Sequence, residues 1–230
     1  MTPQLRAMPA LDVAAQWFVR ELRERFPSIV LARVFGTVPA DRLPPAERAA
    51  ADAAAGVALF PRTDVLTLFG TAGTQPAWNE RHRSEGHRAI PLVSRAHVEN
   101  IPMVSRLLSD LRYRHPGDPA PAPFVMRAVA NANGLFFLPD AATALDERGR
   151  KVIPAGDFVR EHSIRSVFGF GGSYVIQPTF ISTIVFTQES ITKETAMHFL
   201  QLSSALKAGT ARLVNRGLLF GREDAARGNG

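Results

Sequence analysis

The segment from Trp78 to His87 gathers side chains that are well suited to holding a small molecule. Trp78 offers a flat stacking face, Asn79 offers a hydrogen-bond donor and an acceptor, and Arg81 offers a planar fork for an anion. His87 adds an imidazole in the same long, polar connection, a type of segment that often carries function. We therefore predict ligand contacts from these four residues. The alternative, in which Trp78 only anchors the connection on the core and the arginines are solvated, stays open.

Three aromatic residues near the glycines at 169, 171 and 172 are further candidates for ligand contact. They are Phe168, Phe170 and Tyr174. Aromatic side chains can stack on a ligand, but they also bury large apolar areas in cores. Core packing is the stronger alternative for these three.

The histidines and serines do not form a recognisable catalytic or metal-binding pattern. His82 and His87 are five residues apart, which is not the same-face spacing of a zinc-binding helix, and the chain has no cysteine. Ser173 follows two glycines, but the motif of a nucleophile elbow is absent. We expect no metal site and no enzymatic activity. A haem held by His87 or His97 stays open, without specific support from the sequence.

The glycines at 169, 171 and 172 raise the question of a phosphate-binding loop. Such a loop needs a glycine pattern directly before a helix, so that helix amides meet the phosphate. Here the β-branched run FISTIVFT follows, and no GxxxxGK[ST] motif occurs. We predict instead a tight turn at Gly171, Gly172 and Ser173 between two antiparallel strands, in which the glycines allow positive φ and close backbone approach.

The surrounding periodicity predicts the elements that would position these residues. Paired strands near the end of the chain require an antiparallel hairpin, so we predict an α+β fold with helices on both sides of the sheet and the terminal helices packed together. Helices are expected over about 11–26, 45–55, 98–111 (with Pro102 in its first turn) and 158–162, and from Thr192 onwards, and strands at IVLARVF, VLTLFG, LFFL, IRSVFGF and FISTIVFT.

Composition limits the classes of function. The 230 residues are 46% hydrophobic and carry a net charge of +6, but 24 of the 27 basic residues are arginines scattered among acidic residues. This pattern does not favour a nucleic-acid surface. No apolar run is long enough to span a membrane, and no signal peptide is evident, so we expect a cytoplasmic protein. We expect one domain over 1–220, with a proline-rich surface loop at 115–123 and a disordered tail at 221–230.

Several stretches resemble the GAF-like sensory domains found beside histidine kinases and SpoIIE-type serine phosphatases in bacterial signalling proteins. They are IRSVFGFGGSY, FISTIVFTQESITKETAMHFLQLSSALKAGTARLV, VLTLFGTAG, PAWNERHRSEGHRAIPL, LFFLPDA and VIPAGDFV, and the resemblance spans about residues 10–215. It implies an antiparallel sheet of about six strands, helices on both sides and a ligand-sized pocket under the connections.

The resemblance also implies a class of function. We expect a non-enzymatic sensory domain of a two-component or related system, which binds a small molecule and relays its presence through the terminal helices to an output protein. The ligand is not specified, and no kinase or phosphatase sequence follows the last helix in this chain. Apolar positions on the terminal helices suggest a homodimer. A protein-interaction scaffold, whose pocket is filled by its own side chains, is the alternative, and an enzyme built on the same sheet is a less favoured third reading.

Overall fold

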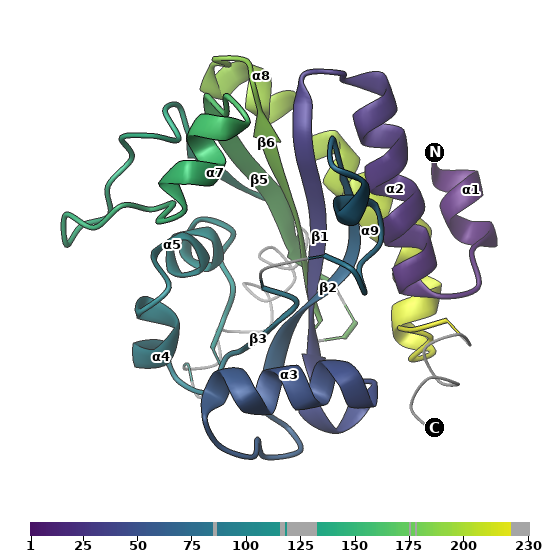
Figure 1. Cartoon of the computed structure of the whole chain (residues 1–230). Helices are drawn as coiled ribbons and strands as arrows, with labels where there is room; N and C mark the ends of the chain where they lie inside the picture. The colour runs from purple at the N-terminus through teal and green to yellow at the C-terminus, as the bar shows by residue number, and fades with distance from the viewer. Residues whose placement is uncertain (85–86, 116–117, 119–132, 175, 178, 222–230) are drawn as a thin grey trace.

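A six-stranded antiparallel sheet forms the centre of the protein (Figure 1). The computed structural model describes residues 1–84, 87–115, 118, 133–174, 176–177 and 179–221. The strand order is β3-β2-β1-β6-β5-β4, so β1 and β6 are the two central strands. The strands are β1 (Ile29–Pro39), β2 (Asp64–Gly73), β3 (Ala89–Pro91), β4 (Gly134–Leu138), β5 (Ser166–Ser173) and β6 (Phe180–Thr187).

Helices cover both faces of this sheet, but with unequal bulk. One face carries the long helices α2 and α9, with α1 packed against α9. The other face carries the short helices α4, α5 and α7, while α3 lies beside the edge strand β3. The helices are α1 (Thr2–Ala7), α2 (Leu11–Arg25), α3 (Pro45–Ala55), α4 (Arg95–Glu99), α5 (Pro102–Asp110), α7 (Gly156–Glu161), α8 (Lys193–His198) and α9 (Leu200–Asn215), and the 3-10 turns are η1 (Ala40–Arg42) and η2 (Pro76–Asn79).

The predicted fold class is confirmed by this arrangement. The sheet has six antiparallel strands, helices lie on both sides, and the N- and C-terminal helices pack together. These features are the GAF-like architecture that the resemblance implied. The predicted loop at 115–123 and tail at 221–230 lie outside the described residues, except for His115, Asp118 and Gly221.

Alternation along the strands separates two cores. In β1, Leu31 and Phe35 belong to the core under α5 and α7, whereas Ala32 and Val34 belong to the core under α2 and α9. Successive side chains of a strand point to opposite faces, so one central strand can supply both layers. The two sides of the sheet are therefore chemically separate environments.

The structure differs from the sequence-based expectation in three places, and the first two differences have a clear physical cause. Pro102 starts α5 as a separate helix after α4, because proline lacks the amide that a continuous helix would need. The short elements α1 and β3 were not predicted, since neither is long enough to show a period. The last helix is divided at Phe199 into α8 and α9, with the Thr192 side chain capping α8 as expected.

The prediction of a tight turn at the late glycines was wrong. Gly169, Gly171 and Gly172 all lie inside β5 and pair with residues of β6. The connection comes later, where the Tyr174 amide donates to the Thr179 carbonyl over 2.9 Å. Close approach is confirmed, because a Cβ on Gly169 would lie 2.9 Å from Leu107 Cδ1 and 3.2 Å from the Thr183 carbonyl oxygen. No helix follows these glycines directly, so the phosphate loop stays excluded.

Helix α2 lies so close to β2 that Gly70 has no space for a side chain. A Cβ there would stand 2.5 Å from the Ala15 carbonyl carbon and 2.6 Å from the Gln16 nitrogen, both backbone atoms. We expect Gly70→Ala to lower the free energy of unfolding by about 1–3 kcal/mol, because the helix must move away from the sheet. Gly156→Ala is the matched control, since a Cβ there meets nothing within 4 Å. Urea unfolding of both variants checks this, and equal stabilities would contradict the close contact.

Candidate ligand-binding cavity

A cavity of about 520 Å³ lies between the sheet and the short helices α5 and α7. Strands β1, β2, β3 and β6 form its floor, and α5, α7 and the chain before each of them form its roof. Trp78 and His87 form part of the wall. The floor residues are Leu31, Arg33, Phe35, Leu66, Ile90, Ile184 and Phe186, and the roof residues are Ile101, Met103, Val104, Leu107, Ile153, Pro154, Ala155 and Phe158.

The floor follows from strand alternation. Leu31, Arg33 and Phe35 occupy every second position of β1 and line the cavity together. Ile184 and Phe186 repeat the pattern on the neighbouring strand β6. Two central strands therefore present one continuous surface to a ligand, and that surface is apolar except at Arg33.

Arg33 places a cation in the middle of this surface. Its Cα pairs with Thr71 on β2 and Ile184 on β6, and its Nη2 donates to Ser84 Oγ over 2.7 Å. Burial lowers the pKa of Arg33 to about 10, which still leaves the guanidinium charged at neutral pH. Within the described part of the lining there is no aspartate or glutamate.

Trp78 anchors the connection, as one alternative had it, and it also lines the cavity, while its contact with a ligand stays a prediction. Its ring packs on the backbone of β2, because a Cβ on Gly73 would lie 2.6 Å from it. The same ring makes edge contacts with Phe158 at 5.6 Å and His162 at 4.7 Å between centroids, and it lines the cavity. Trp78 thus anchors the connection and also closes one side of the cavity.

Asn79 holds the connection in shape and does not line the cavity. Its side-chain oxygen accepts from the Gly73 amide over 3.2 Å, and its Nδ2 donates to the carbonyls of Gly73 and Gln75 over 3.1 and 2.9 Å. These bonds fix the turn that brings Trp78 onto the sheet. The structure does not test whether Asn79 meets a ligand.

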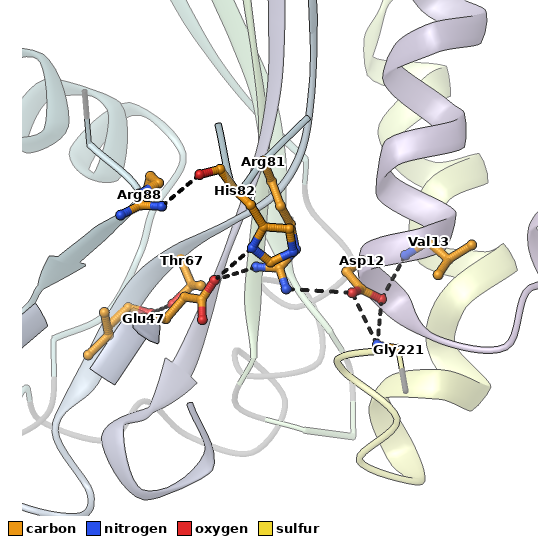
Figure 2. A network of polar contacts seen from close by, with 9 residues as sticks. Asp12, Val13, Glu47, Thr67, Arg81, His82, Arg88 and Gly221 are labelled. Atoms are coloured by element: carbon orange, nitrogen blue, oxygen red, sulfur yellow. Dashed lines mark hydrogen bonds and ion pairs between the residues drawn. The ribbon is translucent and has the colours of Figure 1, made fainter. Parts of the chain in front are cut away.

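Arg81 lies in a buried ionic network outside the cavity (Figure 2). Its Nη1 is 2.7 Å from Glu47 Oε1 in α3, and its Nη2 is 3.8 Å from Asp12 Oδ2 in α2. Asp12 also accepts from the Gly221 amide over 3.0 Å, and the guanidinium stands 5.3 Å from the centroid of the Phe220 ring. The network fastens the connection to two helices and to the C-terminal segment.

The aromatic candidates Phe168, Phe170 and Tyr174 lie on the opposite face of the sheet. All three are buried in the core under α2 and α9, where the two phenylalanines contact Phe199. The Tyr174 hydroxyl lies 2.7 Å from Thr210 Oγ1 in α9. The structure therefore does not bring these residues together with Trp78 and His87. Only Trp78 and His87 of the seven predicted residues line the cavity.

A buried tyrosine–carboxyl pair fixes the end of the roof. Tyr113, just after α5, donates to Asp64 Oδ2 over 2.9 Å at the start of β2, and its ring packs edge-on against Phe180. Burial raises the pKa of the Asp64 carboxyl, and burial together with the nearby Asp64 raises the pKa of the Tyr113 hydroxyl. This hydrogen bond between the end of α5 and the start of β2 ties α5 to the sheet.

Sequence reasoning did not predict that Arg33 lines the cavity. The signal was present, since Arg33 is the single charged residue in the run IVLARVF. A cation inside a β-branched strand is costly to bury and so often marks a site. The roof residues gave no comparable signal, because apolar positions on a helix look the same whether they pack or line a cavity.

Within the described residues, neither a metal-binding cluster nor a membrane-spanning helix occurs. No group of three or more histidine, aspartate or glutamate side chains there could hold a metal ion. No helix within the same residues is long and apolar enough to cross a membrane. His97, an alternative haem ligand, is not among the described cavity residues.

Comparison with known proteins gives structural similarities at low sequence identity. No protein family and no curated protein sequence matches the chain. Among solved structures, the phycoerythrobilin-bound GAF domain of a cyanobacterial phytochrome is 10% identical, with a TM-score of 0.47, over 94% of this chain and 91% of that one. A bacteriophytochrome from the photosynthetic bacterium R. palustris is 10% identical over 92% of this chain, with a TM-score of 0.45.

The chromophore-binding domain of that bacteriophytochrome is a third similar structure. It is 11% identical over 94% of this chain, with a TM-score of 0.42. The chain spans 36% of the solved bacteriophytochrome chain and 60% of the solved chain of the chromophore-binding domain. No ligand or activity is carried over from these three structures.

The ionic network around Arg81 predicts a large effect on stability. Arg81→Met leaves the carboxylates of Glu47 and Asp12 buried without their shared cation, so we expect the free energy of unfolding to fall by about 3–5 kcal/mol. Arg83→Met is the matched control, because the Arg83 side chain is 74% exposed and its pair with Glu80 lies at the surface. Denaturant unfolding measures both. A loss below 1 kcal/mol for Arg81→Met would contradict a tight network.

Proposed function

We propose that this protein is a non-enzymatic sensory domain that binds a small, largely apolar molecule in the cavity under α5 and α7. The observation that carries the proposal is the cavity itself, about 520 Å³ in volume and lined by Trp78 and by aromatic residues of the strands and of α7. That volume lies within the range of small-molecule sites, which are commonly apolar with a few polar groups. The aromatic residues other than Trp78 are Phe35, Phe158 and Phe186.

The lining favours binding over chemistry. Within its described part, the polar side chains are the Arg33 guanidinium, the His87 imidazole and the Trp78 indole, without a serine, threonine or carboxylate. A nucleophile with an adjacent base, which most hydrolytic and transfer reactions need, is not provided by these residues. A scaffold with a pocket filled by its own side chains is the second candidate, and the open volume argues against it.

We propose that occupancy is relayed through the connection between β2 and β3. This connection carries Trp78 at the cavity wall and Arg81 in the ionic network with Asp12 and Phe220. A ligand shifts a conformational equilibrium only if it binds one arrangement better than another. A ligand that moves Trp78 would alter the position of Arg81, and through it the contact between α2 and the C-terminal segment.

A homodimer and a signalling output protein belong to the same proposal. Apolar side chains of the terminal helices reach solvent, with Val13 at 39%, Phe26 at 40% and Met197 at 50% exposure. Two copies could bury them against each other. Sedimentation equilibrium gives the mass of the species in solution, and a monomer at high protein concentration would remove the dimer from the proposal.

An uncharged dye tests the cavity without knowledge of the natural ligand. N-phenyl-1-naphthylamine fluoresces strongly in apolar surroundings, and we expect saturable binding with one site per chain. Val104→Phe, whose side chain would enter the cavity from α5, should weaken this binding by about tenfold or more with little loss of stability, because there is space to fill.

The control for this test is Val57→Phe, which adds the same ring at a residue that is 63% exposed. It should bind the dye as the parent does. If Val104→Phe destabilises the fold strongly and the parent binds no dye, then the cavity is closed by its own side chains and the scaffold becomes the better account.

The relay makes a prediction about hydrogen exchange. The Leu11 and Asp12 amides donate to the carbonyls of Leu218 and Leu219 over 2.9 and 3.1 Å, beside the Arg81 network. Saturation with the uncharged dye should change the exchange rates of these two amides in the parent but not in Arg81→Lys, whose ammonium cannot bridge two carboxylates with a planar fork. Mass spectrometry of the exchanged peptides measures this, and identical changes in both proteins would count against a relay through Arg81.

A further inference from the structure

We propose that Gln16 in α2 is a positioning residue for the ligand cavity, because its side chain joins α2 to β2 and to the connection that carries Trp78. Gln16 is not among the described residues that line the cavity, and it acts through Trp78, which forms part of the cavity wall. This inference rests on the proposed binding function. It adds a residue that controls ligand affinity from the helix layer on the other face of the sheet.

The outer edge of β2 is only partly covered by its neighbouring strand. β3 is three residues long and pairs with Val65, Leu66 and Thr67 of β2. Thr71 and Gly73 lie farther along β2, where β3 does not reach. Both residues are buried, and a buried backbone amide or carbonyl needs a hydrogen-bond partner. This part of the edge therefore needs partners that do not come from β3.

Two side-chain amides supply these partners. Gln16 Oε1 accepts from the Thr71 amide over 3.1 Å, and Gln16 Nε2 donates to the Thr71 carbonyl over 2.8 Å. Asn79 makes the same pair of bonds with Gly73, over 3.2 and 3.1 Å, two residues farther along the edge. A carboxamide carries an acceptor and donors side by side, as an opposing strand presents a carbonyl and an amide. Gln16 and Asn79 thus take the place of a longer β3.

Gln16 also holds the connection itself. Its Nε2 donates to the Asn79 carbonyl over 3.3 Å, and Arg20, one turn farther along α2, donates to the same oxygen over 3.4 Å. Asn79 directly follows Trp78, whose ring lines the cavity. A shift of Gln16 relative to β2 therefore changes the position of Trp78 as well as the pairing at the edge.

The close contact between α2 and β2 allows a glutamine side chain to reach this edge. A Cβ on Gly70 would lie 2.5 Å from the Ala15 carbonyl carbon and 2.6 Å from the Gln16 nitrogen. Gly70 immediately precedes Thr71, so the same contact places Gln16 beside the residue with which its side chain pairs. The carboxamide then bridges three main-chain groups, which are the amide and carbonyl of Thr71 and the carbonyl of Asn79. A side chain of the same length without donors or acceptors leaves all three without this partner.

The test replaces this carboxamide and follows both the dye and Trp78. Gln16→Met keeps the length of the side chain and a high helix propensity, but removes its donors and its acceptor. We expect it to weaken binding of N-phenyl-1-naphthylamine by about 5- to 10-fold, as for the loss of one or two neutral hydrogen bonds that fix the wall. In protein labelled with 5-fluorotryptophan, the fluorine NMR resonance of Trp78 should also shift in the folded variant. The chain has two tryptophans, so Trp17→Phe assigns this resonance.

Two further variants complete the test. Gln201→Met makes the same change at an exposed position in α9, and should leave the dye affinity and the Trp78 resonance unchanged. Gln16→Glu keeps an acceptor for the Thr71 amide, but at neutral pH it cannot donate to the carbonyls of Thr71 and Asn79, so it should also lose affinity. The prediction applies to each Gln16 variant separately, and one that folds is sufficient for the test.

The outcomes distinguish this inference from the proposed binding function. If the dye does not bind the parent, the binding function fails, and the inference fails with it. If the dye binds the parent, and binds Gln16→Met and Gln16→Glu as tightly, with the Trp78 resonance unchanged, then the binding function stands and the positioning role is overturned. A lower melting temperature of Gln16→Met with unchanged affinity and resonance would assign Gln16 to the fold alone, which also overturns this inference.

Discussion

A sheet that is apolar on both faces must be covered on both, and in this protein the two covers differ in bulk. Helices α2 and α9 close one face with long, continuous apolar stripes, and their contact is so tight that Gly70 lies directly under the backbone of α2. The other face is covered by the short helices α5 and α7, which leave about 520 Å³ between themselves and the central strands. The cavity is a consequence of this unequal covering, and its apolar character follows from the strand alternation beneath it.

The connection between β2 and β3 joins the cavity to the rest of the molecule. Trp78 stands at the cavity wall, and Asn79 fixes the turn by hydrogen bonds to Gly73. Arg81 reaches Glu47 and the C-terminal segment (Figure 2). Trp78, Asn79 and Arg81 thus have separate structural roles: one lines the cavity, one fixes the turn and one forms the ionic network. Burying the charges of Arg81, Glu47 and Asp12 costs desolvation free energy. The network therefore contributes more by fixing the position of the connection than by raising the free energy of unfolding.

Much of the fold was predictable, because the strong periods and β-branched runs fall where the strands and long helices are. IVLARVF became β1, and FISTIVFT became β6. Local sequence patterns do not show on which face of the sheet the side chain of each residue lies. Phe168 and Phe170 look like candidate ligand contacts in the sequence, but they face α9, while Arg33 looks like an exception in a strand and faces the cavity. The sequence predicted a turn at Gly171 and Gly172, but these glycines lie inside β5, where they allow close packing. The residues against which they pack are distant in the sequence, so the local pattern does not show this role.

The most direct test of binding in the cavity is a crystal structure of the protein with bound N-phenyl-1-naphthylamine. We predict that its aromatic rings lie between the central strands and α5, beside Trp78. A cavity closed by its own side chains, with the dye elsewhere on the surface, would contradict this prediction.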